Sequence, residues 1–150
     1  MAAWGWVGLL CRRFDKYIGF QVPGWLTIPG LALLVAGLVL AAITIGFFVF
    51  EGRGTPAVFD PPRRFVPHGP FRFIRNPMYV GWVTILLGLA LYLASASMVL
   101  YAMAVFFLIH TFVVRVEEPG LRKRFGEEYA EYCRRVPRWL PRLSRGHSGT

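Results

Sequence analysis

The chain is poor in acidic residues, cysteine and recognisable metal-binding or hydrolytic motifs. Its 150 residues include 8 acidic residues against 17 Lys and Arg, and the formal net charge is +9. Cys11 and Cys133 lie far apart, so we expect neither a disulfide framework nor a zinc site. The three histidines have no metal-ligand spacing, and no G-x-S-x-G, H-E-x-x-H or phosphate-loop motif is present. We therefore expect no bound metal, and a hydrolase has little support.

Apolar residues dominate what is present. They make up 55% of the sequence, and the mean hydropathy of +0.48 is too high for an ordinary soluble domain of this length. In a soluble protein the basic excess would suggest nucleic acid, but no recognition helix or basic aromatic sheet is visible. Basic residues that flank apolar runs are typical of membrane proteins that contact anionic lipids. We expect membrane lipids as partners, and no nucleic acid.

Three apolar runs, at residues 28–50, 78–94 and 98–114, have about the length that a helix needs to cross roughly 30 Å of hydrocarbon. They show no alternation of polar and apolar residues, and backbone groups in lipid must be satisfied within the segment, so strands are excluded. The sequence predicts a single all-α integral membrane domain over residues 1–150, with three transmembrane helices.

The distribution of basic residues predicts the orientation of these helices. The link around residues 95–97 is short and uncharged, which favours an antiparallel hairpin. The segment before the second run and the tail at residues 115–142 are both rich in arginine, so both are expected in the cytoplasm of a bacterial-type inner membrane. Residues 52–70, rich in proline and glycine, predict an ordered, extended linker. The tail predicts one short cytoplasmic helix that Pro137 stops.

The first 25 residues fit this topology less simply. Their apolar stretch precedes the charges Arg12, Arg13 and Lys16, which is the wrong order for a signal peptide. They are too short and too charged to span fully, and their aromatic residues favour an interfacial segment. A fourth, partial crossing is the alternative.

A polar turn, HGPFRFIRNPMYVG, stands at the mouth of the second apolar run. Arg75 can bind a carboxylate or phosphate through two N–H groups, and Asn76 offers both a donor and an acceptor. Pro77 suits the first turn of a helix, Tyr79 supplies a ring face and a hydroxyl, and Gly81 permits close approach of a ligand or another chain. A simpler interpretation, in which the arginines only set the topology, stays open.

The third apolar run stops at Glu117 and Glu118. Negative charges at a helix C-terminus oppose the macrodipole, so a purely structural role is a poor explanation for this pair. We expect the pair to meet the Arg75 turn at the same membrane edge, where costly charges usually mark function. His110, inside the third run, is either a hydrogen-bonded buried imidazole or a proton acceptor.

These blocks together resemble the isoprenylcysteine carboxyl methyltransferase family, which is related to the membrane phospholipid N-methyltransferases. The resemblance is carried by the turn, by the E-E pair and by FGEEYAEYCRRVPRWLP, and it covers about residues 52–141. Asn76 stands where the eukaryotic members carry histidine, and Phe71 replaces a tyrosine. The arginine that holds the prenylcysteine substrate in the family falls on Val113, and the nearest cation is Arg115.

The resemblance implies methyl transfer from S-adenosyl-L-methionine to a lipophilic acceptor at the cytoplasmic membrane edge. The cofactor-binding residues that it implies are Gly69, Phe71, Arg75, Asn76, Pro77, Tyr79, Gly81, Glu117 and Glu118. The candidates for a catalytic role are His110 and Arg115. The acceptor can be a phospholipid amine, an isoprenoid carboxylate or a lipophilic thiol, and a homodimer would enlarge the small volume that three helices enclose.

Two other functions stay open at this point. Sterol reductases, which use NADPH, share a related R-H-P-N-Y-x-G type motif, although this chain lacks their length. A non-catalytic membrane module, in which the motif is a relic of the fold, is the other alternative.

Overall fold

The computed structural model describes residues 2–19, 22–51 and 69–141, and within these ranges the chain is helical, without a strand. The all-α fold is thereby confirmed for the described residues, whereas residues 52–68 of the predicted linker lie outside them. The α-helices are α1 (Ala2–Cys11), α2 (Thr27–Glu51), α3 (Pro77–Tyr92), α4 (Ala96–Phe112) and α5 (Glu118–Arg135). Short 3-10 helices cover Arg12–Tyr17, Gly24–Leu26 and Gly69–Arg72.

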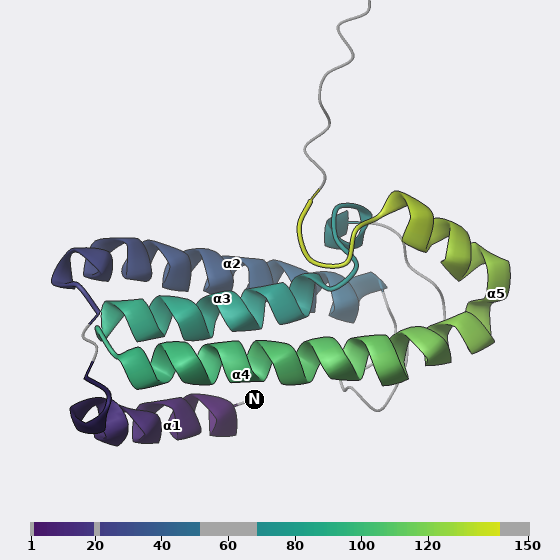
Figure 1. Ribbon diagram of the computed structural model, residues 1–150. Helices are drawn as coiled ribbons and strands as arrows, with labels where there is room; N and C mark the ends of the chain where they lie inside the picture. The colour runs from purple at the N-terminus through teal and green to yellow at the C-terminus, as the bar shows by residue number, and fades with distance from the viewer. Residues whose placement is uncertain (1, 20–21, 52–68, 142–150) are drawn as a thin grey trace, which may run out of the picture.

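Four helices lie side by side as a layer in the order α2, α3, α4, α1 (Figure 1). Helices α2, α3 and α4 alternate in direction, and α5 turns back over the end of the layer where α3 begins. The start of α3 and the end of α4 therefore share one end of the molecule, and that end carries the candidate site.

Helices α2 and α3 approach closely because glycines face each other across their interface. A Cβ on Gly88 would lie 2.4 Å from the backbone nitrogen of Leu34, and one on Gly37 would lie 2.8 Å from that of Ile85. A Cβ on Gly30 would lie 2.5 Å from the backbone nitrogen of Tyr92, and one on Gly81 would lie 3.2 Å from that of Ala41. Small residues at such contacts are the usual means by which helices associate in membranes. Gly81 thus admits helix α2.

The opposite end of the layer is closed by polar contacts around the α3–α4 turn. Ser95 caps α4 by accepting a hydrogen bond from the Met98 N–H at 3.3 Å. Asp15, from the 3-10 helix after α1, accepts hydrogen bonds from the Ser97 N–H at 2.9 Å and the Ser97 hydroxyl at 2.6 Å. A carboxylate is favourable at a helix N-terminus, so this contact anchors the N-terminal segment to α4.

Two helical stretches are long and apolar enough to cross a membrane, namely Gly24–Phe47 and the continuous helix Ala96–Arg135, while Pro77–Tyr92 is apolar but shorter. The three predicted runs at residues 28–50, 78–94 and 98–114 correspond to α2, α3 and α4. Whether the chain makes three or four crossings stays a prediction. In the structure α1 lies along α4, and its Gly8 approaches the ring of Tyr101.

The expectation that Glu117 and Glu118 end the third helix is wrong. Helix α4 passes without interruption through a π-helical turn, Val113–Glu117, into α5. The argument from the macrodipole therefore fails, because the backbone carbonyls at this point are still bonded within the helix. The chain changes direction later, at Gly126, where φ is 55° and ψ is −129°. Helix α5 then ends at Arg135, just before Pro137, as predicted.

Candidate functional site

The turn before α3 is held by backbone and side-chain contacts with the segment that follows α5. The Tyr132 hydroxyl donates to the Phe71 carbonyl at 2.7 Å, and the Arg75 N–H donates to the Pro137 carbonyl at 2.9 Å. The Asn76 amide donates to the Arg138 carbonyl at 3.3 Å. Asn76 precedes α3 with an extended φ of −125° and does not cap the helix with its side chain. Its amide therefore fastens two chain segments together.

Tyr79 and Glu117 meet in space although they are 38 residues apart in the sequence. The Tyr79 hydroxyl, in the first turn of α3, donates to Glu117 Oε2 at 3.0 Å. Glu117 is the last residue of the π-helical turn. Such turns inside α-helices occur often at functional sites, because the extra residue re-aims the neighbouring side chains. The expected meeting of the two distant stretches is confirmed by this contact.

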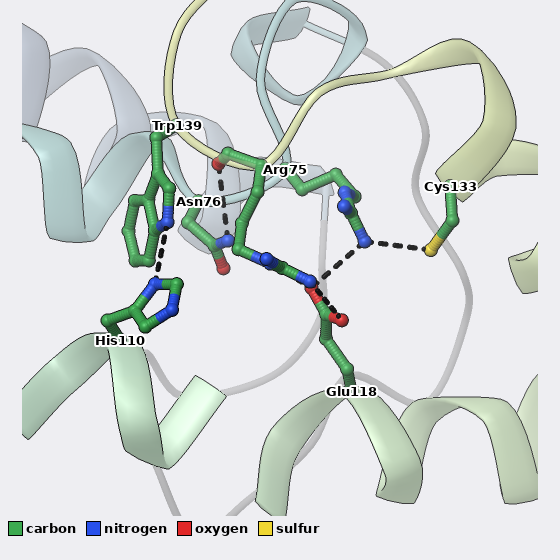
Figure 2. Close-up of polar contacts among 7 residues, drawn as sticks. Arg75, Asn76, His110, Glu118, Cys133 and Trp139 are labelled. Carbon is green, nitrogen blue, oxygen red and sulfur yellow. Dashed lines mark hydrogen bonds and ion pairs between the residues drawn. The ribbon is translucent and has the colours of Figure 1, made fainter. Parts of the chain in front are cut away.

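A second contact between the same stretches is a buried arginine–carboxylate cluster, formed by Arg75, Glu118 and Arg138. Arg138 donates from Nε to Glu118 Oε1 at 2.7 Å and from Nη2 to Oε2 at 2.9 Å. Arg75 Nη1 donates to the same Oε1 at 2.9 Å and to Cys133 Sγ at 2.9 Å. Figure 2 shows Arg75 reaching both Glu118 and Cys133. The side chains of Arg75 and Glu118 are only 12% and 10% exposed, so this ion pair is shielded from water.

The two adjacent glutamates have opposite electrostatic environments. Burial raises the pKa of Glu117, the nearby Glu118 adds to the rise, and the hydrogen bond from Tyr79 offsets it only in part. Burial also works against ionisation of Glu118, but the hydrogen bond from Arg138 and the charges of Arg75, Arg138 and Arg122 outweigh it and lower the pKa of Glu118. Glu118 thus pairs with two guanidinium groups that lower its pKa, whereas Glu117 has the neutral Tyr79 as its partner and a raised pKa.

The remaining predicted residues lie around this centre with different neighbours. Gly69 has a positive φ of 57°, and its Cα packs against the ring of Phe47 in α2. Pro77 is fully buried at the start of α3. Gly69, Pro77 and Gly81 therefore serve to seat α3 and its entry turn.

The two candidates for a catalytic role, His110 and Arg115, lie in different surroundings, and no contact joins either of them to Tyr79 or Glu117 among the described residues. Arg115 is exposed, although it belongs to the π-helical turn. His110 Nδ1 accepts a hydrogen bond from the indole N–H of Trp139 at 3.1 Å, and Figure 2 shows the indole nitrogen directed at the imidazole, with the two rings tilted by 38°. Phe106 completes the group with ring centroids 5.3 Å from Trp139 and 6.1 Å from His110. This contact corresponds to the hydrogen-bonded imidazole that was one of the two expectations for His110.

Sequence reasoning missed the contribution of the chain end. Tyr132, Cys133, Arg138 and Trp139 all contact the predicted site residues, whereas the tail was expected to form a short helix and to carry part of the family resemblance, with none of its residues in the site. Their signal in the sequence was the mixture of aromatic and basic residues around two prolines. The described part of the chain holds no group of three or more potential metal ligands.

The amino-acid sequence is similar to that of several known proteins. The sequence is 33% identical over 129 residues to the cobalt-zinc-cadmium resistance protein CzcN of Cupriavidus metallidurans, covering 83% of this chain and 56% of that protein. It is 24% identical to the methanethiol S-methyltransferase of Crocosphaera subtropica, over 92% of this chain and 54% of that protein. It is 35% identical to the human protein-S-isoprenylcysteine O-methyltransferase, over 78% of this chain and 42% of that protein.

The chain thus spans about half the length of the curated relatives that it matches. A sequence profile described as phospholipid methyltransferase matches residues 25–128. The matched stretch includes α2, α3, α4, the Tyr79–Glu117 contact and two members of the arginine–carboxylate cluster. By this match, which covers more than half of its residues, the chain belongs to the phospholipid methyltransferase family.

Proposed function

We propose that the protein transfers a methyl group from S-adenosyl-L-methionine to a lipophilic acceptor at the cytoplasmic edge of a membrane. The observation that carries the proposal is the Tyr79–Glu117 contact, made beside the buried Arg75–Glu118 ion pair at one end of an apolar helical layer. The relatives named as methyltransferases are consistent with this chemistry.

The donor groups of the site fit such a cofactor. S-adenosyl-L-methionine carries a carboxylate, an ammonium and a sulfonium centre, and ribose hydroxyls. Arg75 Nε is buried and has no partner among the described residues, so it is available to a carboxylate. Glu117 can offer Oε1 to a hydroxyl or a cationic group, since its hydrogen bond with Tyr79, within the described ranges, is made through Oε2. The buried Nε of Arg75 is an unsatisfied donor that the carboxylate of such a ligand would complete.

In this proposal Arg75, Tyr79 and Glu117 contact the cofactor, while Gly69, Phe71, Asn76, Pro77 and Gly81 shape the turn and helix that carry them. Glu118 acts by holding the guanidinium of Arg75. When bound, the cofactor would supply a methyl group on a positively charged sulfur, and the neutral thioether that remains is a good leaving group. The protein then has to align the acceptor with that methyl group and keep water away, which the apolar helices do.

The protein groups also bear on the proton balance of the reaction. A carboxylate acceptor needs no base, whereas an ammonium acceptor must first lose a proton. His110 Nδ1 already accepts the indole hydrogen, so in the neutral ring the proton lies on Nε2 and this edge can only donate. Glu117, whose pKa is raised by burial, is better suited as the proton acceptor, and with an ammonium acceptor its Oε1 would take the proton instead of contacting the cofactor. Arg115, exposed on the π-helical turn, is left to attract an anionic lipid or acceptor headgroup.

The membrane arrangement that accompanies this function has three crossings, by α2, α3 and α4. As a helix, the apolar run at residues 98–114 rises about 24 Å, so Glu117 and Glu118 would lie past its end, at the edge of the hydrocarbon core. The site would then lie at the cytoplasmic face of an inner membrane, because the arginine-rich segments flank that end. The acceptor would enter from lipid between the helices, and a homodimer would supply further walls.

The test is to incubate membranes that contain the protein with S-adenosyl-L-methionine labelled in its methyl group and to identify the labelled lipid fraction. The expected result is label in a phospholipid amine, an isoprenoid carboxylate or a lipophilic thiol, with loss of label in the Glu117→Ala variant. Absence of label, together with binding of NADPH by the purified protein, would overturn the proposal in favour of a reductase.

A further inference from the structure

The segment that follows α5 contacts four of the predicted site residues, namely Arg75, Asn76, Glu118 and His110. This C-terminal strap, residues 136–139, lies beyond residues 25–128 that the family profile matches. Its Pro137 carbonyl accepts from the Arg75 N–H, its Arg138 carbonyl accepts from the Asn76 amide, and its Trp139 donates to His110. The strap thus joins the turn before α3 to α4, and its one charged side chain enters the arginine–carboxylate cluster.

The charges in that cluster are unevenly shared. Two guanidinium groups share one carboxylate, which leaves a net positive charge where the side chains of Arg75 and Glu118 are mostly buried. Arg138 takes the two-pronged geometry, through Nε and Nη2 to both oxygens of Glu118. Arg75 reaches Glu118 through Nη1 alone, and its Nε has no partner among the described residues. A buried N–H left unpaired in this way costs free energy unless a ligand completes it.

We propose that Arg138 is a positioning residue, which occupies Glu118 and thereby leaves the Nε edge of Arg75 free for the carboxylate of the methyl donor. Without Arg138, Arg75 would be the one arginine of the described residues still hydrogen-bonded to Glu118, and the two side chains would form the two-pronged pair that arginine and carboxylate favour. The Nε edge of Arg75 would then turn toward Glu118. This inference rests on the proposed function, because the anion that Arg75 awaits is part of the methyl donor.

The experiment is calorimetric titration of the purified, detergent-solubilised protein with S-adenosylhomocysteine. Arg138→Gln is expected to weaken binding by about 10- to 100-fold, since one charge-assisted contact of Arg75 is lost. Arg138→Lys keeps the charge but lacks the planar guanidinium, so its affinity should lie between that of the unsubstituted protein and that of Arg138→Gln. The matched control is Arg135→Gln, which removes an exposed arginine paired with Glu131 on α5 and should change the affinity less than about twofold.

The decisive variant is the double substitution Arg138→Gln with Glu118→Gln. It removes the carboxylate that would capture Arg75, so it should bind more tightly than Arg138→Gln alone, by about fivefold or more. A role of Arg138 in holding the fold would give the opposite result, because a second deletion from the cluster would add to the damage. Thermal unfolding of each variant, followed in the same detergent, reports that damage separately.

The outcomes separate this inference from the proposed function. If the unsubstituted protein does not bind S-adenosylhomocysteine, the proposed function is overturned and the role of Arg138 with it. If it binds, but Arg138→Gln behaves as Arg135→Gln does, or the double variant binds no better than the single one, only the role of Arg138 is overturned.

Discussion

The sharpest structural prediction concerns Gly88, in the α2–α3 interface. A Cβ at this position would lie 2.4 Å from the backbone nitrogen of Leu34, 2.7 Å from its Cα and 2.9 Å from the carbonyl oxygen of Gly30. All three are backbone atoms, so no side chain can rotate away. Because non-bonded contacts are favourable at about 3.5–4.0 Å, Gly88→Ala must push the two helices apart by roughly 1 Å.

The size of the effect follows from two opposing contributions. Overpacking of a close interface costs typically about 1–3 kcal/mol, and a clash with backbone belongs at the upper end of that range. Alanine gains about 1 kcal/mol over glycine in a helix interior. We expect Gly88→Ala to lower the free energy of unfolding by about 2 kcal/mol. Gly46→Ala, in α2, is the matched control, because nothing lies within 4 Å of its Cβ, and it should stabilise by up to about 1 kcal/mol.

Unfolding of each variant in mixed micelles by increasing amounts of denaturing detergent, followed by circular dichroism, measures this difference. Tyr79 lies on the same helix as Gly88, so the displaced α3 should also weaken binding of S-adenosylhomocysteine. If Gly88→Ala were as stable as Gly46→Ala, the close α2–α3 contact would be absent and the reasoning would be refuted.

Three further predictions concern the site and the N-terminal anchor. Tyr79→Phe removes the hydrogen bond to Glu117 and should weaken nucleotide binding about tenfold by calorimetry; unchanged affinity would remove Tyr79 from the site. Because the pKa of Glu117 is raised above its ordinary value of 4.5, its ionised form is lost as pH falls through the raised pKa. Nucleotide affinity should fall with it, and Glu117→Gln should abolish that pH dependence, whereas a persisting step would assign it elsewhere. Asp15→Ala removes the carboxylate that accepts from the Ser97 N–H and hydroxyl, and it should lower the free energy of unfolding by about 1 kcal/mol in unfolding titrations. Nucleotide affinity should change little, and a loss of affinity would contradict a purely structural role.

Much of the helical framework was predictable because it depends on local composition. The apolar runs at residues 28–50, 78–94 and 98–114 match α2, α3 and α4 closely, and Pro77 begins α3 as its fixed φ favours. The meeting of Tyr79 with Glu117 was also predictable, since a short link between two helices brings the start of one beside the end of the other. The glycines of the α2–α3 interface carried a legible signal as well, because Gly30 and Gly37 share the seven-residue spacing of Gly81 and Gly88.

The rest depended on tertiary contacts that no local pattern encodes. The π-helical turn at Val113–Glu117 differs from an α-helix only in its hydrogen-bond spacing, which leaves no clear pattern in the sequence. Glu117 and Glu118 were therefore assigned to a helix end, although the helix continues through them. The strap could not be placed for a different reason. Its direction is set by the positive φ of Gly126, and a glycine in a polar tail is compatible with many conformations. The partners of Arg138 therefore became visible only in three dimensions.

The measurement that tests the central claim most directly is a calorimetric titration of the purified protein with S-adenosylhomocysteine, repeated for Glu117→Ala. The two distant stretches that meet through Tyr79 and Glu117 are predicted to form one nucleotide site, so the unsubstituted protein should bind one molecule per chain and the variant should bind at least about tenfold more weakly. Absence of binding by the unsubstituted protein, or equal affinity for the variant, would contradict the account.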